Sequence, residues 1–170
     1  MKNQRPALNR RSLGLSFIAA AALASAAGAW AQAKPIVIGL PIAQRGPAGV
    51  ADHADFLNGA KLAAKEINAA GGVNGRKIEL KVFDIDIMTP EGTQATFRKM
   101  VDAKVHAIAS PFVLIPTPAM EAVARYKAPY LHGNTMQASL DLVKANPSKF
   151  GHIFQIDPPE TFYGAGFPAF

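Results

Sequence analysis

Short apolar runs and amphipathic stretches alternate along the chain from residue 35 onward. Pro35 to Leu40 is a continuous apolar run, which is typical of a strand buried on both faces of a sheet. From about Asp52 the apolar positions recur every three or four residues, which predicts a helix that stops at Gly71-Gly72. The apolar residues Ile78, Leu80 and Val82 then alternate with Glu79, Lys81 and Phe83, which predicts a second strand.

Further strands and helices follow in the same order. Thr89-Pro90-Glu91 supplies an N-cap, a proline for the first helical position and an acid for the first turn. Thr117-Pro118 predicts the same start for a helix that runs to about Tyr126. Three more strands are expected at residues 105–110, 129–132 and 152–157. This alternation predicts an α/β fold: a three-layer α/β/α lobe with a mainly parallel, doubly wound sheet, whose ligand crevice lies beyond the carboxyl ends of the strands.

The first 33 residues have the pattern of an export signal. A basic, polar stretch precedes the uncharged, alanine-rich run from Leu13 to Ala31, and Ala31-Gln32-Ala33 offers the small residues of a cleavage site. We therefore predict a signal peptide at residues 1–33 and a periplasmic location. A retained membrane anchor is the alternative, and Arg10-Arg11 leaves open a twin-arginine route.

Most of the net positive charge lies in this N-terminal segment. The whole chain carries +6, but residues 34–170 hold 14 bases against 12 acids. A nearly neutral domain gives no reason to expect nucleic acid as a partner. The absence of cysteine excludes a lipid-modified cysteine and any disulfide. No glycine-rich nucleotide motif is present.

The sequence offers little for an enzyme. Ser110, His132 and Asp84 could in principle form a triad, but the chain has no G-x-S-x-G turn. The four histidines lack the spacing of a metal site. We predict a non-catalytic protein with no metal and no cofactor, and keep an exported α/β enzyme as a weaker alternative.

One block of the sequence is far more specific than periodicity requires. Residues 58–80 read N-G-A-x-L-A-x-x-x-I-N-A-x-G-G-V-N-G-R-K-I-E-L. The block resembles the branched-chain amino acid type of periplasmic solute-binding protein, which has the type I fold and delivers ligands to ABC transporters. The resemblance implies a monomeric receptor that closes two lobes on a small organic ligand and presents it to a permease in the inner membrane. An extracellular sensory domain of a receptor is the main alternative.

The resemblance also implies a domain arrangement. Residues 34–157 would form the N-terminal ligand-binding lobe, and residues 158–170 would begin the crossover into a second lobe. Chains of this family are normally more than twice as long, so we expect a fragment whose second lobe is missing or truncated. A complete single domain of flavodoxin-like topology is the alternative.

The resemblance places the ligand against the loops that follow the first, third and fourth strands, where hydroxyl groups and main-chain N–H groups hold its polar end. Residues 112–115 read Phe-Val-Leu-Ile and offer no side-chain donor, which weakens the case for an α-amino acid and favours an apolar or aromatic body. The expected ligand is an amino acid, an aromatic acid or an amide. The candidate ligand-binding residues are Asn134, Thr135, Met136, Phe112, Val113, Asp52, His53 and Arg45.

Overall fold

A parallel sheet of five strands forms the centre of the domain. The computed structural model describes residues 34–163. The strands are β1 (Ile36–Ile42), β2 (Ile78–Asp84), β3 (Ala107–Ser110), β4 (Tyr130–His132) and β5 (Ile153–Gln155). They are ordered β2-β1-β3-β4-β5, and every neighbouring pair is parallel. The predicted α/β class and doubly wound parallel sheet are therefore confirmed. The order reverses direction between β1 and β3, where such sheets open a crevice.

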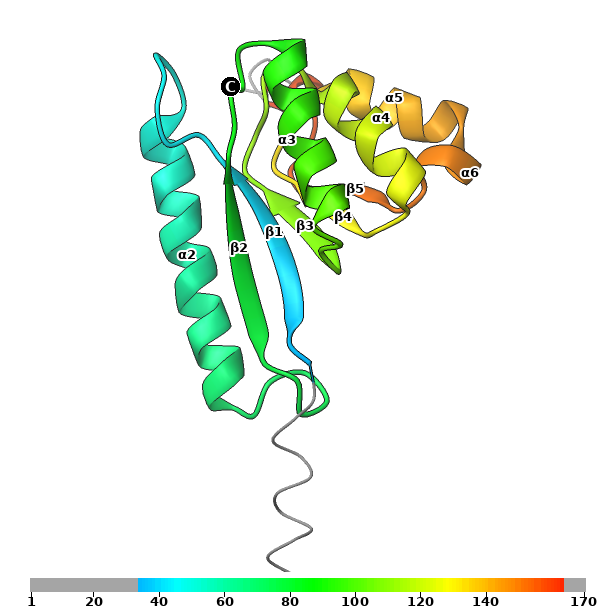
Figure 1. Cartoon of the computed structure of the whole chain (residues 1–170). Coiled ribbons are helices and arrows are strands. Elements are labelled where there is room, and N and C mark those ends of the chain that lie inside the picture. Colours follow the sequence, from blue (N-terminus) through cyan, green and yellow to red (C-terminus); the bar gives the residue numbers. More distant parts are fainter. Residues whose placement is uncertain (1–33, 164–170) are drawn as a thin grey trace, which may run out of the picture. The chain divides into compact units, whose positions relative to one another are not determined.

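Helices cover both faces of this sheet. They are α2 (Val50–Ala69), α3 (Pro90–Asp102), α4 (Pro116–Tyr126), α5 (Gln137–Ala145) and α6 (Pro147–Phe150), and the 3-10 turn η2 (Glu160–Phe162) follows β5. Figure 1 shows α2 on one side of the sheet and α3 to α6 on the other. None of the helices within residues 34–163 is long and apolar enough to cross a membrane. The predicted signal peptide lies outside the described residues.

The sequence predicted the start of α3 correctly and the start of α4 incorrectly. Thr89 caps α3 as predicted, because its hydroxyl oxygen accepts the N–H of Gly92 at 3.1 Å. The predicted cap at Thr117 is wrong: α4 begins at Pro116, two residues before the Pro118 start that this cap implies, and no side chain caps it. Helix α2 begins at Val50 behind Gly49, whose φ of 75° puts it in the left-handed region that glycine tolerates.

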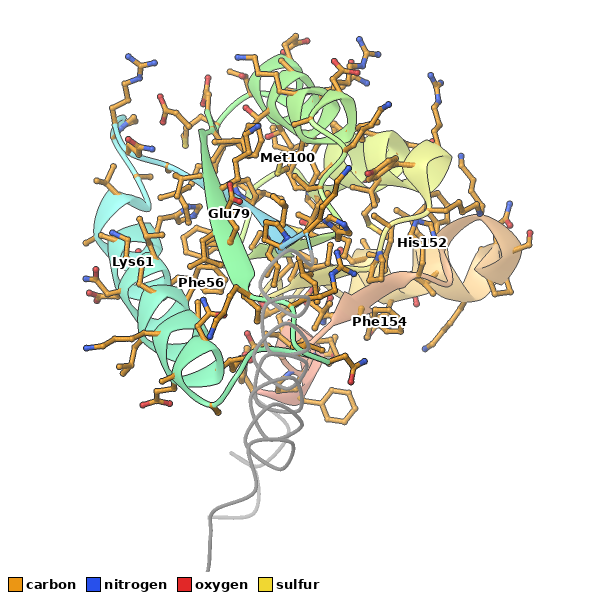
Figure 2. All side chains as sticks on the ribbon, turned by 60° about the horizontal axis from the view of Figure 1, so that its bottom comes forward. Phe56, Lys61, Glu79, Met100, His152 and Phe154 are labelled. Atoms are coloured by element: carbon orange, nitrogen blue, oxygen red, sulfur yellow. The ribbon has the colours of Figure 1, made fainter. Side chains whose placement is uncertain are left out.

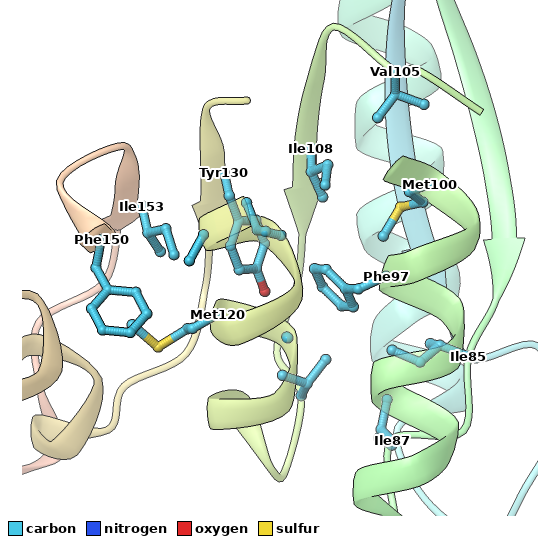
Figure 3. Close-up of a cluster of buried hydrophobic side chains, with 14 of the residues drawn as sticks. Ile85, Ile87, Phe97, Met100, Val105, Ile108, Met120, Tyr130, Phe150 and Ile153 are labelled. Carbon is cyan, nitrogen blue, oxygen red and sulfur yellow. The ribbon is translucent and has the colours of Figure 1, made fainter. Parts of the chain in front are cut away.

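The main hydrophobic core lies between the sheet and α3 and α4 (Figure 3). Phe97 of α3 packs edge-on against the Tyr130 ring of β4, with their centroids 5.1 Å apart. Gly39 of β1 lets α3 approach, because an added Cβ would stand 3.0 Å from the Met100 sulfur. The core extends along the sheet to Phe150 of α6. Burying these side chains is what orders the carboxyl ends of the strands.

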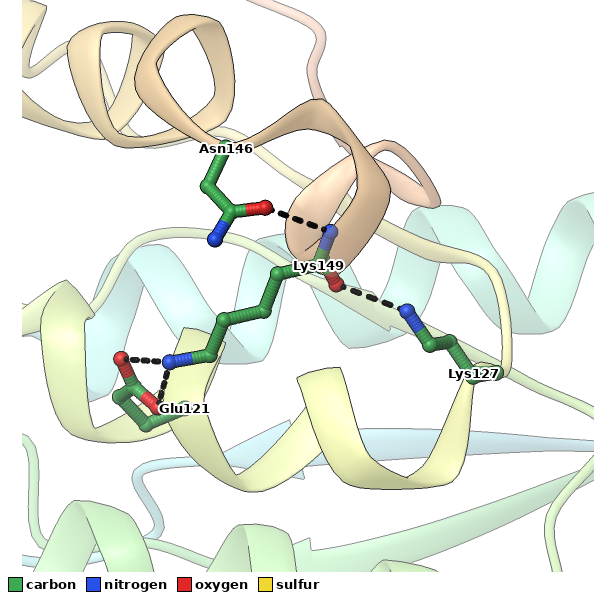
Figure 4. Close-up of polar contacts among 4 residues, drawn as sticks. All are labelled: Glu121, Lys127, Asn146 and Lys149. Atoms are coloured by element: carbon green, nitrogen blue, oxygen red, sulfur yellow. Dashed lines mark hydrogen bonds and ion pairs between the residues drawn. The ribbon is translucent and has the colours of Figure 1, made fainter.

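Helices α5 and α6 were not expected from the sequence. The Asn146 side chain starts α6 by accepting the N–H of Lys149 at 3.1 Å. Lys149 then pairs with Glu121 of α4 at 2.7 Å, and Lys127 donates to the Lys149 carbonyl at 3.2 Å (Figure 4). These contacts fasten α6 to the middle of α4 and to the residue that caps its C-terminal end.

The opposite face of the sheet is only partly covered. Phe56 of α2 points toward the sheet and is half-buried, whereas Lys61 points into solvent (Figure 2). Beyond β1 this face carries Leu131 of β4 and its register partner Phe154 of β5. Leu131 is 40% exposed and Phe154 is 50% exposed. These two residues form an apolar stripe that no described helix covers.

Candidate functional site

The loops that follow β3 and β4 meet at the carboxyl edge of the sheet. Parallel pairing of Ser110 with His132 brings the two strand ends level, so the residues just beyond them face each other. Together they enclose a hollow of about 190 Å³, which we call the β3–β4 hollow. Its lining consists of Phe112, Val113, Leu114, Gly133, Asn134, Thr135 and Met136. Five of the eight candidate residues therefore lie around one hollow.

Asn134 is the most constrained polar residue of the β3–β4 hollow. Its side-chain Oδ1 accepts the N–H of Val113 at 2.7 Å, which joins the two loops directly. Its own backbone N–H donates to Nδ1 of His132 at 3.3 Å. The residue is only 2% exposed, and its Nδ2 has no hydrogen-bond partner among the described residues. Asn134 Nδ2 is thus a buried donor without a partner among the described residues.

His53 of α2 contacts Phe112 in the loop that follows β3. Its Nδ1 accepts the N–H of Ala43 at 2.9 Å, so the neutral ring carries its proton on Nε2. The ring meets Phe112 edge-on, with centroids 5.1 Å apart. Burial lowers the pKa of His53, and the Phe112 backbone and the Asp52 carboxylate offset only part of this shift. Nε2 itself has no partner in hydrogen-bonding geometry among the described residues, so His53 braces Phe112 as a neutral ring.

A buried polar cluster lies directly beneath the loops. The Ser110 and Tyr130 hydroxyl groups are 3.1 Å apart, and burial raises the pKa of Tyr130. Burial also lowers the pKa of His132 to about 4, so this ring is neutral at ordinary pH and its Nδ1 is a hydrogen-bond acceptor. Ser110 and His132 bond to these other partners and not to each other, and Asp84 pairs with Arg45. The triad considered from the sequence is not assembled.

Arg45 and Asp52 do not join the β3–β4 hollow. Arg45 pairs with Asp84 at 2.8 Å and lines a different and larger cavity of about 600 Å³ at the ends of β1 and β2, which we call the β1–β2 hollow. The other charged residues of that lining are Asp86 and Lys99. Asp52 is exposed in the first turn of α2, and Gly49 rather than Asp52 is the cap of that helix.

Two residues at this edge were missed by sequence reasoning. Gly49 supports the loops from below, because an added Cβ would stand 2.8 Å from Ile87 and 3.3 Å from the Phe112 ring. Glu160 of η2 joins the β4 loop, since its N–H donates to the Thr135 carbonyl at 2.6 Å and its Oε2 accepts the N–H of Gln137 at 2.7 Å. The positive φ of Gly49 was detectable in principle from the Gly-Pro-Ala-Gly loop. Nothing in the local sequence marks Glu160.

Comparison with known proteins gives these loops a context. The periplasmic binding protein family model matches residues 35–161. A Leu/Ile/Val-binding protein homolog from Brucella abortus (strain 2308) is 37% identical over 82 residues, which are 48% of this chain and 21% of the relative.

Solved structures agree with this match. A candidate branched-chain amino acid ABC transporter structure from Silicibacter pomeroyi superposes with a TM-score of 0.73 at 35% identity, over 78% of this chain and 34% of that one. An ABC transporter substrate-binding protein from Desulfitobacterium hafniense, solved with Leu, gives 0.55 at 25% identity, over 75% and 35% of the two chains.

The present chain thus spans about a third of the solved relatives and about a fifth of the curated one. The family model covers well over half of the present chain, and it describes binding proteins rather than enzymes. The family model matches most of the chain, and the solved relatives share its fold. We conclude that the chain belongs to the periplasmic binding protein family.

Proposed function

We propose that this chain forms the ligand-binding N-terminal lobe of an extracytoplasmic substrate-binding protein of an ABC transporter, of the branched-chain amino acid type. It would capture a small organic solute, work without a cofactor or a catalytic step, and act as a monomer in the periplasm. The family match over residues 35–161 carries this proposal. The Brucella relative is a Leu/Ile/Val-binding protein homolog and the Desulfitobacterium relative was solved with Leu, and both support a solute of amino acid size.

The β3–β4 hollow supports the proposal from the chemistry of its lining. Phe112, Leu114 and Met136 contribute apolar side chains to the lining, and Asn134 and Thr135 contribute polar ones. A few placed polar groups in an otherwise apolar concave surface are typical of small-molecule sites. In the proposed mechanism the solute binds more tightly to a closed two-lobed state than to the open one, and the inner-membrane permease recognises that closed state.

Nuclear magnetic resonance of the 15N-labelled full chain tests the proposal. L-leucine, L-isoleucine, phenylacetate and 4-methylpentanamide are titrated to millimolar concentration, and shifts are expected at residues 112–114 and 133–136 for at least one of them. Leu114→Lys places a charge in the β3–β4 hollow and is expected to weaken binding. Leu62→Lys, at a residue of α2 that is 57% exposed and outside the lining, is the matched control. Absence of shifts with every solute, or turnover of a solute, would contradict the proposal.

A further inference from the structure

Two buried histidines hold the backbone at the carboxyl edge of the sheet in the same way. His53 of α2 accepts the N–H of Ala43 at its ring atom Nδ1, over 2.9 Å. His132 at the end of β4 accepts the N–H of Asn134, also at Nδ1, over 3.3 Å. The exposed fractions of the two histidines are 0% and 1%. Because a backbone N–H can only donate, Nδ1 must be an unprotonated acceptor in both rings.

Both histidines act on adjacent residues of the loop that follows β3. The His53 ring meets the Phe112 ring edge-on, with centroids 5.1 Å apart. His132 acts through Asn134, because it holds the backbone of this residue while the side-chain oxygen of Asn134 accepts the Val113 N–H at 2.7 Å. Phe112 and Val113 are therefore held in place by histidines from two different elements, α2 and β4.

Protonation of either ring would reverse the role of its Nδ1. A protonated imidazole carries an N–H at both nitrogens, so Nδ1 would face the backbone N–H as a second donor and the hydrogen bond would be lost. A buried charge without an acceptor adds its own cost. The chain relieves both costs by exposing the ring to water, and this movement releases the backbone that the ring holds.

The groups that face the two rings offset these costs only in part. Burial lowers the pKa of His53, and the Phe112 backbone and the Asp52 carboxylate oppose this shift without cancelling it. Around His132 the titratable groups are Tyr130, with its ring centroid 5.1 Å away, and Asp157, whose carboxylate lies beside the next residue in the chain, Gly133. Burial nevertheless lowers the pKa of His132 to about 4. Within residues 34–163, neither ring forms an ion pair.

We infer that His53 and His132 are the positioning residues of the proposed binding loops, and that these loops keep their solute-binding arrangement only while both rings are neutral. Acid therefore releases the solute by freeing the loop that follows β3, while the rest of the sheet stays folded. This inference rests on the proposed function and adds the condition under which the lobe binds.

Titration at two pH values tests the inference. L-leucine and 4-methylpentanamide keep the same charge at pH 7.5 and at pH 5.0, so a change in their affinity comes from the protein. Each is titrated into the 15N-labelled full chain at both pH values. The solute that binds at pH 7.5 should bind about tenfold more weakly at pH 5.0, because protonation lowers the population of the binding-competent loops. The amide signals of β1 and β2 should keep their folded positions.

Asparagine variants test the acceptor at Nδ1 separately from its protonation. The side-chain oxygen of asparagine takes the place of Nδ1 and does not titrate. His53→Asn and His132→Asn should lose less affinity at pH 5.0 than the unsubstituted chain. At pH 7.5 each should bind more tightly than the leucine variant of the same residue, which has no acceptor.

His106 provides a matched control. Its Nδ1 also accepts a backbone N–H, from Val37 at 3.0 Å, but His106 is exposed and precedes β3 at the opposite edge of the sheet. His106→Asn should therefore leave the affinity at both pH values unchanged.

Each outcome points one way. Equal affinity at both pH values, or a full acid loss in the double variant His53→Asn/His132→Asn, would overturn the inference and leave the proposed function standing. Loss of the folded β1 and β2 signals together with the solute would also overturn it, since the effect would then be global unfolding. If no solute of the panel binds at pH 7.5, the proposed function fails and the inference fails with it.

A measurement on the unsubstituted chain decides if the variants fail to fold. The nuclear spin coupling between the two nitrogens of an N–H···N hydrogen bond reports the bond from Ala43 to His53 and the bond from Asn134 to His132 directly. At least one of these couplings should disappear between pH 7.5 and pH 5.0 together with solute binding. Loss of binding while both couplings persist would contradict the assigned role.

Discussion

Two hollows open at the same edge of the sheet, and they differ in almost every respect. The β1–β2 hollow has a volume of about 600 Å³ and is lined by charged groups, among them Arg45 and Asp84, which pair with each other at 2.8 Å. The β3–β4 hollow has about 190 Å³ and an apolar lining with a buried amide. In the larger hollow most of the charged groups have partners near solvent, whereas the smaller one holds the Asn134 side chain away from water.

The difference teaches that the two hollows satisfy their polar groups in different ways. Asp86 of the β1–β2 hollow accepts both the Met88 N–H and the Thr89 hydroxyl, so its carboxylate is engaged by its own turn. In the β3–β4 hollow, Oδ1 of Asn134 accepts the Val113 N–H, and its Nδ2 has no partner among the described residues. Among the described residues that line these two hollows, a buried side-chain atom without a hydrogen-bond partner occurs only in the smaller one.

The largest expected effect concerns the buried histidine beneath the β3–β4 hollow. The pKa of His132 is about 4 in the folded chain, against an ordinary value of 6.5 when unfolded. Between these values the unfolded chain binds the proton and the folded chain does not, so stability is complete above about pH 6.5 and is lost as the pH falls. The loss through this residue is about 3 kcal/mol at pH 4. Urea unfolding at pH 7.5 and at pH 4.5 measures most of it.

A control isolates the histidine from the carboxylates that also titrate in this range. His132→Gln should show a flatter dependence of unfolding free energy on pH than the unsubstituted chain. Direct titration of the His132 ring signals by nuclear magnetic resonance gives the same answer without a variant. A midpoint near 6.5 would show that the ring is not buried as described.

The next effect concerns Gly49, which packs against Ile87 and against the Phe112 ring of the β3–β4 hollow. Gly49→Ala places a Cβ 2.8 Å from Ile87 and 3.3 Å from Phe112, at a φ of 75°. Crowding and backbone strain together should lower the free energy of unfolding by about 2–3 kcal/mol, measured by urea denaturation. Gly59→Ala is the matched control, since no atom lies within 4 Å of its added Cβ in the middle of α2. That variant should be more stable by about 0.5–1 kcal/mol, and equal effects at both sites would refute the packing described.

The smallest effect is expected in the β1–β2 hollow. Arg45→Ala removes an ion pair in which the arginine side chain is 86% exposed. Such a pair is screened by solvent and salt, so the change in unfolding free energy should stay below about 1 kcal/mol and vanish at high salt. Solute affinity should not change. A large loss of solute affinity in Arg45→Ala would indicate that the solute binds in the β1–β2 hollow instead.

Much of the fold could be predicted because it depends on local patterns. The apolar runs locate the strands, and Thr89-Pro90 marks the start of α3. The prediction for Thr117 was wrong because Pro116 already satisfies the first helical position, so the helix begins before the threonine. Helices α5 and α6 are short and were hidden by polar residues, since burial of a few side chains such as Phe150 decides their existence rather than periodicity.

The site was predictable only in part, for a physical reason. Residues of one loop, such as Asn134 and Thr135, stay together whatever the strand order is. Placing them against Phe112 requires the family resemblance or the sheet topology. Arg45 was assigned by its position after the first strand, but Asp84 at the end of β2 competes for its charge and draws it toward the β1–β2 hollow. Glu160 is reached through a contact between residues 25 apart in sequence, Thr135 and Glu160, which no local pattern encodes.

The apolar stripe on the partly covered face bears on how the chain must be handled in the experiments above. Leu131 and Phe154 lie side by side on β4 and β5, and both remain largely in contact with water. Salts that are excluded from protein surfaces, such as sulfate and phosphate, raise the cost of hydrating such a stripe. Titrations are therefore best performed in dilute chloride buffers, where salting-out of this face does not compete with solute binding.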